Sequence, residues 1–136
     1  MNILVIDGQG GKLGAQIINL IKNKNYMNVK IFAVGTNAMA TEAMMKQKPD
    51  VIATGENPII VLSKDADIII GPIGIVIANS MYGEITKNSS FAVSDSKAIK
   101  LLIPINKCNN IIVGVTNNLL NDSLNQITDY LDSTLK

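Results

Sequence analysis

Residues 3–14 of the chain are Ile3-Leu4-Val5-Ile6-Asp7-Gly8-Gln9-Gly10-Gly11-Lys12-Leu13-Gly14. Four apolar residues in a row are followed by four glycines within seven positions, and then by an apolar pattern with helical spacing. This order is typical of a buried parallel strand, a tight turn and a crossover helix. A glycine turn that ends at a helix N-terminus presents free backbone N–H groups to an anion. The stretch therefore predicts an α/β fold with a nucleotide or phosphate site near its N-terminus.

Strands and helices are predicted to alternate along the rest of the chain. Apolar runs indicate strands at residues 29–34, 50–53, 68–70, 101–105 and 111–115. Helices are expected at residues 10–23, 38–47, 58–64 and 118–135, although residues 59–62 would also suit a strand. Residues 73–87 are expected to combine helix and turn. Five residues rich in Asn separate the last two strands, which is typical of a hairpin and leaves open an antiparallel pairing there.

This alternation predicts a Rossmann-like three-layer sandwich with a mostly parallel sheet and a possible antiparallel strand pair near the C-terminus. A chain of 136 residues suits one such domain, which we expect to span residues 1–136. Apolar residues make up 47% of the sequence, which is high for a soluble monomer of this size. We therefore expect a homo-oligomer, with the apolar segment 73–81 as the candidate dimer face.

Polar residues and glycines follow each strand that is expected to be parallel. Ligands of open α/β sheets bind outside the carboxyl ends of the strands, so these residues are predicted to share one crevice. Loops between strands and helices are, however, rich in such residues in any α/β protein. The candidate binding residues are Gly8, Gln9, Gly10, Gly11, Lys12, Gly14, Thr36, Asn37, Thr54, Gly55, Glu56, Gly71, Pro72 and Asn106.

The glycine spacing departs from the dinucleotide fingerprint G-x-G-x-x-G, which would need glycine where the chain has Leu13. The spacing from Gly8 to Gly14 is G-x-x-G-x-x-G, and it resembles the loop of atypical short-chain dehydrogenases and related nucleotide-sugar or NADP-binding proteins. An acidic residue that holds a ribose hydroxyl is expected about 20 residues further on. Thr36 and Asn37 occupy the end of the second strand instead. This departure disfavours NAD and leaves NADP, another nucleotide or a plain phosphate as the ligand.

Candidates for chemistry are few. Asp7 directly precedes the glycines and could fix the turn through its side chain, bind a ribose hydroxyl or hold Mg²⁺. Glu56 follows a strand and could act as a base, bind a ribose or cap a helix, whereas Glu84 lies in a polar patch that indicates a ligand site or a subunit contact. Cys108 follows a lysine, but most lone cysteines are inert. The Tyr-x-x-x-Lys pair of short-chain dehydrogenases is absent, because the position four residues after Tyr82 is not lysine. No catalytic residue is assigned, and a non-catalytic oligomeric or regulatory subunit is the alternative function.

Composition excludes several classes of function. The net charge of +1 gives no electrostatic footprint of a nucleic-acid-binding protein. All twelve basic residues are lysines, so an anion must be held by backbone N–H groups, hydroxyls, amides and lysine. The absence of histidine excludes imidazole catalysis and most metal-ligand sets, and no metal site is expected. A single cysteine and the lack of a targeting or membrane-spanning segment favour a cytoplasmic protein with no membrane partner.

Short motifs spread over the chain form a recognisable set. They are VIDGQGG (5–11), GTNA (35–38), ATGEN (53–57), GP (71–72), IANSM (77–81), GEIT (83–86), IP (103–104) with Asn106 and Cys108, and VGV (113–115). Together they resemble a family of uncharacterised small bacterial proteins, catalogued as a domain of unknown function and found mainly in anaerobic Firmicutes and their relatives. The resemblance covers nearly the whole chain. It implies a Rossmann-like fold and a bacterial origin, and it implies no activity or catalytic residue.

Overall fold

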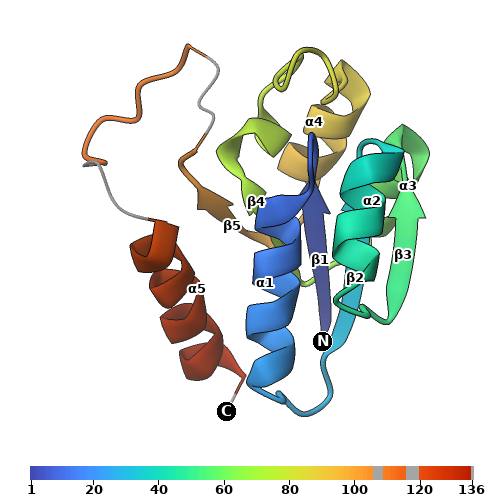
Figure 1. The fold of residues 1–136 in the computed structure, drawn as a ribbon. Helices are drawn as coiled ribbons and strands as arrows, with labels where there is room; N and C mark the ends of the chain where they lie inside the picture. The colour runs from blue at the N-terminus through green and yellow to red at the C-terminus, as the bar shows by residue number, and fades with distance from the viewer. Residues whose placement is uncertain (106–108, 116–119, 136) are drawn as a thin grey trace.

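Five parallel strands form one sheet in the computed structural model, which describes residues 1–105, 109–115 and 120–135 (Figure 1). The strands are β1 (Asn2–Asp7), β2 (Lys30–Gly35), β3 (Val51–Thr54), β4 (Ile68–Pro72) and β5 (Ile99–Ile103). Their order across the sheet is β3-β2-β1-β4-β5, which is the order of the first five strands of a Rossmann sheet. The predicted parallel α/β architecture is therefore confirmed. The order reverses between β1 and β4, and such a switch point is where open α/β sheets bind ligands.

Helices cover both faces of this sheet (Figure 1). One face carries α1 (Lys12–Asn23), α2 (Ala38–Met45) and α5 (Leu120–Thr134). The other face carries α3 (Glu56–Ser63), the short 3₁₀ helix η1 (Ile73–Val76) and α4 (Lys87–Asp95). Because side chains alternate along a strand, Ile3 and Val5 of β1 enter the first core layer, and Leu4 and Ile6 enter the second. None of the described helices is long and apolar enough to cross a membrane.

The C-terminal helix is fixed to the loop that follows α1. Asp132 of α5 accepts a hydrogen bond from the Tyr26 hydroxyl at 2.7 Å and pairs with the Lys24 ammonium at 2.9 Å. Ile127 and Leu131 of the same helix are buried in the core layer of α1. These contacts hold α5 beside α1, so that Leu120 at the start of α5 comes close to the first turn of α1.

The predicted strand at residues 111–115 is wrong, and with it the antiparallel pair. The structure has turns there, with Ile111 89% exposed, Val113 94% exposed and Gly114 at a φ of 88°. β5 pairs with β4 alone among the described strands, and residues 111–115 do not take the outer edge of β5 as a partner strand. An apolar run without such a partner cannot be recognised as unpaired from its sequence alone. Asn106, the candidate site residue of this region, lies outside the described residues.

Residues 73–95 differ in part from what their sequence predicts. In the predicted dimer face 73–81, Ile75 and Met81 are buried in the protein's own core, whereas Ile73, Val76 and Ile77 are half-buried. A homo-oligomer that uses this face stays a prediction. Helix α4, in contrast, is absent from the predicted elements because few of its residues are apolar. Its N-cap was nevertheless present in the sequence, since the Thr86 side chain accepts a hydrogen bond from the Ser89 N–H.

Candidate functional site

Asp7 fixes the glycine loop, residues 8–11, which connects β1 to α1. Its carboxylate accepts a hydrogen bond from the N–H of Gly8 at 2.8 Å and another from the N–H of Gly14 at 2.7 Å. The side chain thereby joins the start of the loop to the first turn of α1, and only 6% of the residue is exposed. Of the three roles considered for Asp7, fixing the turn is the one that these contacts show. This role explains why a carboxylate is present directly under a turn that was expected to bind an anion.

Burial raises the pKa of Asp7 above its ordinary value of 3.8, and the negative charge of Glu84 raises it further. The N–H groups of Gly14, Gly8 and Leu13 act in the opposite direction, because they stabilise the carboxylate form. The direction of the net shift means that folding costs more when Asp7 is ionised than when it is protonated. Between pH 3.8 and the pKa of folded Asp7, this side chain is therefore protonated to a greater extent than an exposed aspartate would be.

A raised pKa predicts how the stability of the protein depends on pH. As pH rises from the ordinary value of 3.8 through the pKa of folded Asp7, the unfolded state releases its proton first. The contribution of Asp7 to the free energy of unfolding therefore falls with rising pH in that interval. Urea unfolding over a pH series tests this. The free energy of unfolding of the wild type minus that of Asp7→Asn should decrease as pH rises through this interval. A difference that grows with pH in the same interval would contradict the assignment.

Most amides of the loop already have acceptors inside the protein. The N–H groups of Gly8 and Gly14 donate to Asp7, that of Gln9 donates to the Glu84 carboxylate, and that of Gly11 donates to the Gly8 carbonyl at 2.9 Å. Within the described residues, the N–H groups of Gly10 and Lys12 have no acceptor. The loop and the first residue of α1 therefore offer one free donor each to an anion, fewer than the glycine spacing predicts. The other glycines serve close packing instead: a Cβ on Gly14, for example, would lie 2.5 Å from the Met44 sulfur of α2.

A cavity of about 350 Å³ lies beside the loop, at the switch point between β1 and β4. Lys12 and Gln16 reach it from the first turns of α1, where residues four apart share one face. Pro72 at the end of β4 forms part of the wall, together with residues near β5 and α5. The lining residues are Asp7, Gly8, Gln9, Gly10, Gly11, Lys12, Leu13, Gln16, Pro72, Ile105 and Leu120.

A second cluster lies on the β2 side of the loop, around the carboxylate of Glu84. One carboxylate oxygen accepts hydrogen bonds from the Thr36 hydroxyl at 3.0 Å and from the Asn37 side-chain amide. The Gln9 N–H lies 3.1 and 3.2 Å from the two carboxylate oxygens. Asn37 also donates to the Gln9 carbonyl at 3.0 Å and caps α2 through the Ala40 N–H. The structure thus brings Gln9, Thr36 and Asn37 together, as the sequence predicts. The Glu84 carboxylate, however, accepts hydrogen bonds from all three, where an open crevice was predicted.

The remaining candidate residues lie away from the cavity. Thr54 pairs its hydroxyl with that of Thr41, and Gly55 precedes α3 with a φ of 101°. Glu56 accepts a hydrogen bond from the Thr86 hydroxyl at 2.6 Å, which ties α3 to the start of α4. Gly71 is buried in β4, where a Cβ would lie 2.5 Å from the Ile6 carbonyl oxygen. These four residues connect elements of the fold, and none of them lines the cavity beside the glycine loop.

Sequence reasoning did not assign Gln16, Ile105 or Leu120 to this region, and it did not place Glu84 there. Gln16 could have been found, because it follows Lys12 by one helical turn. Ile105 follows β5 and Leu120 begins α5, and no local pattern indicates that these two residues line the same cavity. Glu84 was considered as a polar group, but its position beside Thr36 depends on how the sheet brings distant loops together. In the described part of the chain, no group of three or more His, Cys, Asp or Glu could hold a metal ion.

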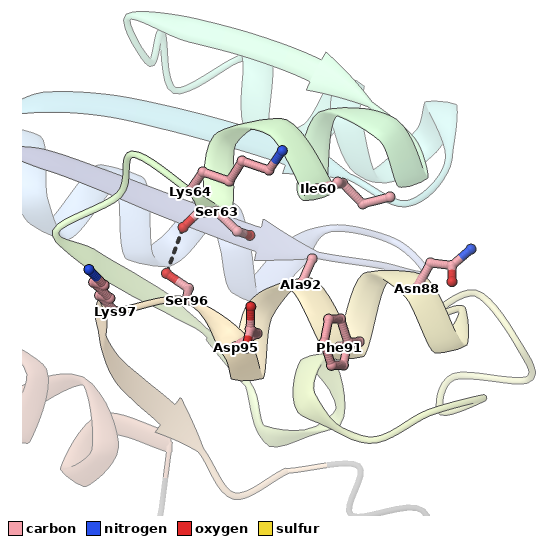
Figure 2. A pocket seen from close by; sticks show the side chains of 9 residues that line it. All are labelled: Ile60, Ser63, Lys64, Asn88, Phe91, Ala92, Asp95, Ser96 and Lys97. Carbon is pink, nitrogen blue, oxygen red and sulfur yellow. Dashed lines mark hydrogen bonds between the residues drawn. The ribbon is translucent and has the colours of Figure 1, made fainter.

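Another cavity, of about 460 Å³, lies between α3 and α4 (Figure 2). Ile60, Phe91 and Ala92 give it an apolar lining, and it contains none of the predicted site residues. Figure 2 shows the Ser96 hydroxyl donating to the Ser63 carbonyl oxygen, at 2.6 Å, where the two helices meet. The hydroxyl of Ser63 itself is buried and has no hydrogen-bond partner in the described structure. This cavity lies between two helices rather than at the carboxyl ends of the strands, so the fold gives no reason to expect a ligand in it.

The unpartnered hydroxyl of Ser63 leads to a prediction about the stability of the protein. Ser63→Ala should raise the free energy of unfolding by about 1 kcal/mol, because a buried hydroxyl without a partner is costly and alanine favours helix. Ser80 provides the matched control, since its buried hydroxyl donates to the Gly74 carbonyl. Ser80→Ala should lower the free energy of unfolding by about 1 kcal/mol. Urea unfolding measures both values, and a loss of stability in Ser63→Ala would show that this hydroxyl is in fact bonded.

The fold and the cavity define a class: a parallel α/β protein with the Rossmann strand order and a ligand-sized cavity at its switch point. The chain belongs to the family described as a domain of unknown function (DUF3842), which it matches over residues 2–136. The predicted membership of an uncharacterised family is therefore confirmed. No curated protein matches the chain.

One solved structure similar to this chain is that of a dodecameric FMN-dependent UbiX-like decarboxylase from Escherichia coli O157:H7. The two share 12% sequence identity with a TM-score of 0.44, over 98% of this chain and 94% of the other. Similarity at this level is distant. No functional residue is transferred from that protein to this one.

Proposed function

We propose that this protein binds a small phosphate-bearing molecule in the cavity beside the glycine loop. The observation that carries the proposal is the coincidence of two free backbone amides, that of Gly10 in the loop and that of Lys12 at the start of α1, with a cavity at the switch point of the sheet. Free N–H groups at a helix N-terminus favour anions, and the helix dipole adds to this preference. Lys12 contributes a cationic side chain to the same cavity.

The size and charge of the cavity limit the ligand. A volume of about 350 Å³ is near the lower end for small-molecule sites, and it suits a phosphorylated sugar or a mononucleotide. Asp7 lines the same cavity, but its carboxylate accepts hydrogen bonds from the N–H groups of Gly8 and Gly14, which weakens its repulsion of an anion. Gln16 supplies a neutral amide that could bond a hydroxyl of the ligand.

Isothermal titration calorimetry with inorganic phosphate, ribose 5-phosphate and AMP tests the proposal. We expect Lys12→Gln to weaken the binding of the tightest of these probes by roughly tenfold, because a charge-assisted contact to phosphate is lost. Lys46→Gln is the matched control, since Lys46 is an exposed lysine at the C-terminal end of α2, away from the cavity. It should leave the affinity within about twofold of the wild type. The absence of binding by every probe at millimolar concentration would overturn the proposed function, and equal losses in the two variants would remove the site from this cavity.

A further inference from the structure

Glu84 is held beside the glycine loop by a turn with unusual backbone geometry. Asn79, Met81 and Tyr82 all have positive φ values, of 64°, 55° and 56°, which non-glycine residues rarely adopt. Such conformations persist only where the surrounding structure enforces them. Here the Asn79 N–H donates to the Ile85 carbonyl at 2.7 Å, and Met81 is 4% exposed against Gly8. The position of Glu84 is therefore set by a packed turn rather than by a freely moving side chain.

The carboxylate of Glu84 occupies the side of the loop that a dinucleotide would need. In Rossmann sheets the diphosphate crosses the loop, and the ribose of one nucleoside lies at the end of β2. In this protein the residues at the end of β2, Thr36 and Asn37, already donate their side-chain hydrogens to Glu84. The Gln9 N–H, which would face a diphosphate, also donates to this carboxylate. The free amides and the cavity lie toward β4 and β5 instead.

We propose that Glu84 determines the ligand class of this site by excluding dinucleotides, so that the site binds molecules with a single phosphate group and no second nucleoside. This inference rests on the proposed function. A second nucleoside at the end of β2 would have to displace Glu84 and leave the Thr36 and Asn37 donors without their acceptor. The negative charge of Glu84 would also repel a second phosphate at Gln9. Both effects act on the dinucleotide and leave a monophosphate on the other side of the loop less affected.

The test compares the tightest of the monophosphate probes, inorganic phosphate, ribose 5-phosphate or AMP, with NAD and NADP on the full-length protein. Calorimetry should show that the wild type binds that monophosphate roughly tenfold or more tightly than either dinucleotide. Glu84→Ala, which opens the β2 side, should reduce this ratio to about threefold or less. Glu84→Gln keeps the side-chain volume and removes the charge. It should tighten the binding of the dinucleotides more than that of the monophosphate, and the ratio should lie between the wild-type and the alanine values.

The outcomes separate this inference from the function on which it rests. Equal affinity of the wild type for NAD or NADP and for a monophosphate would overturn the inference while leaving a phosphate site in place. An unchanged ratio in a folded Glu84→Ala, with folding checked by circular dichroism, would also overturn it. Failure of every monophosphate and dinucleotide probe to bind the wild type would overturn the proposed function itself. The wild-type comparison needs no variant, so it remains decisive even where a substitution at Glu84 disturbs folding.

Discussion

Gly11→Ala should destabilise the protein by about 2–5 kcal/mol, because it adds backbone strain and a steric clash at the same residue. Gly11 has a φ of 70°, in the left-handed region that disfavours residues with a Cβ. An added Cβ would lie 2.5 Å from the Ala40 carbonyl oxygen and 2.6 Å from the Ala40 Cα. These are backbone atoms of α2, so relief requires α1 and α2 to move apart. Urea unfolding of the variant measures the loss.

Gly10→Ala is the matched control for this prediction. Gly10 is the neighbouring residue of the same loop, its φ is outside the left-handed region, and a Cβ there would meet nothing within 4 Å. The change should therefore alter the free energy of unfolding by about 0.5 kcal/mol or less. Similar losses in the two variants would mean that the loop does not have the geometry described here.

Ile70→Ala should cost about 2–5 kcal/mol of unfolding free energy, because it removes three carbons from a fully buried position and leaves a cavity. Ile70 lies in β4, paired with Val5 of β1 on one side and Leu101 of β5 on the other. The surrounding strands cannot collapse into the space without disturbing the sheet. Chemical unfolding again provides the measurement.

Ile111→Ala is the control that separates the observed fold from the one predicted with a hairpin. Ile111 is 89% exposed, so its truncation should change the free energy of unfolding by about 0.5 kcal/mol or less. A loss comparable with that of Ile70→Ala would place Ile111 in a buried strand. That result would restore the hairpin and contradict the turns found at residues 111–115.

Local sequence patterns predicted the elements whose stability is determined locally. The apolar run 3–6, the glycines after it and the spacing of Leu13 and Ile17 are contiguous, and they specify β1, the loop and α1. The role of Asp7 could also be anticipated, since its hydrogen-bond partners are one and seven residues away. Such short-range features need no knowledge of the tertiary structure.

The parts that were missed depend on tertiary contacts. Glu84 is 48 residues from Thr36 and 75 from Gln9, and only the order of the strands brings them together. The glycine spacing suggested an open row of donors, but the acceptors that occupy most of them are set by the fold. Residues 111–115 have the composition of a strand, but they form turns and do not pair with the outer edge of β5.

The most direct test of a phosphate site beside the glycine loop is a set of two-dimensional amide NMR spectra recorded while a monophosphate is added to the wild type. We expect the largest shifts at the backbone amides of Gly10 and Lys12 and at the side-chain amide of Gln16, because these groups line the cavity and the two backbone amides have no acceptor. Residues between α3 and α4, such as Ser63 and Phe91, should not respond. Shifts confined to the α3–α4 cavity, or no shifts at millimolar ligand, would contradict the account.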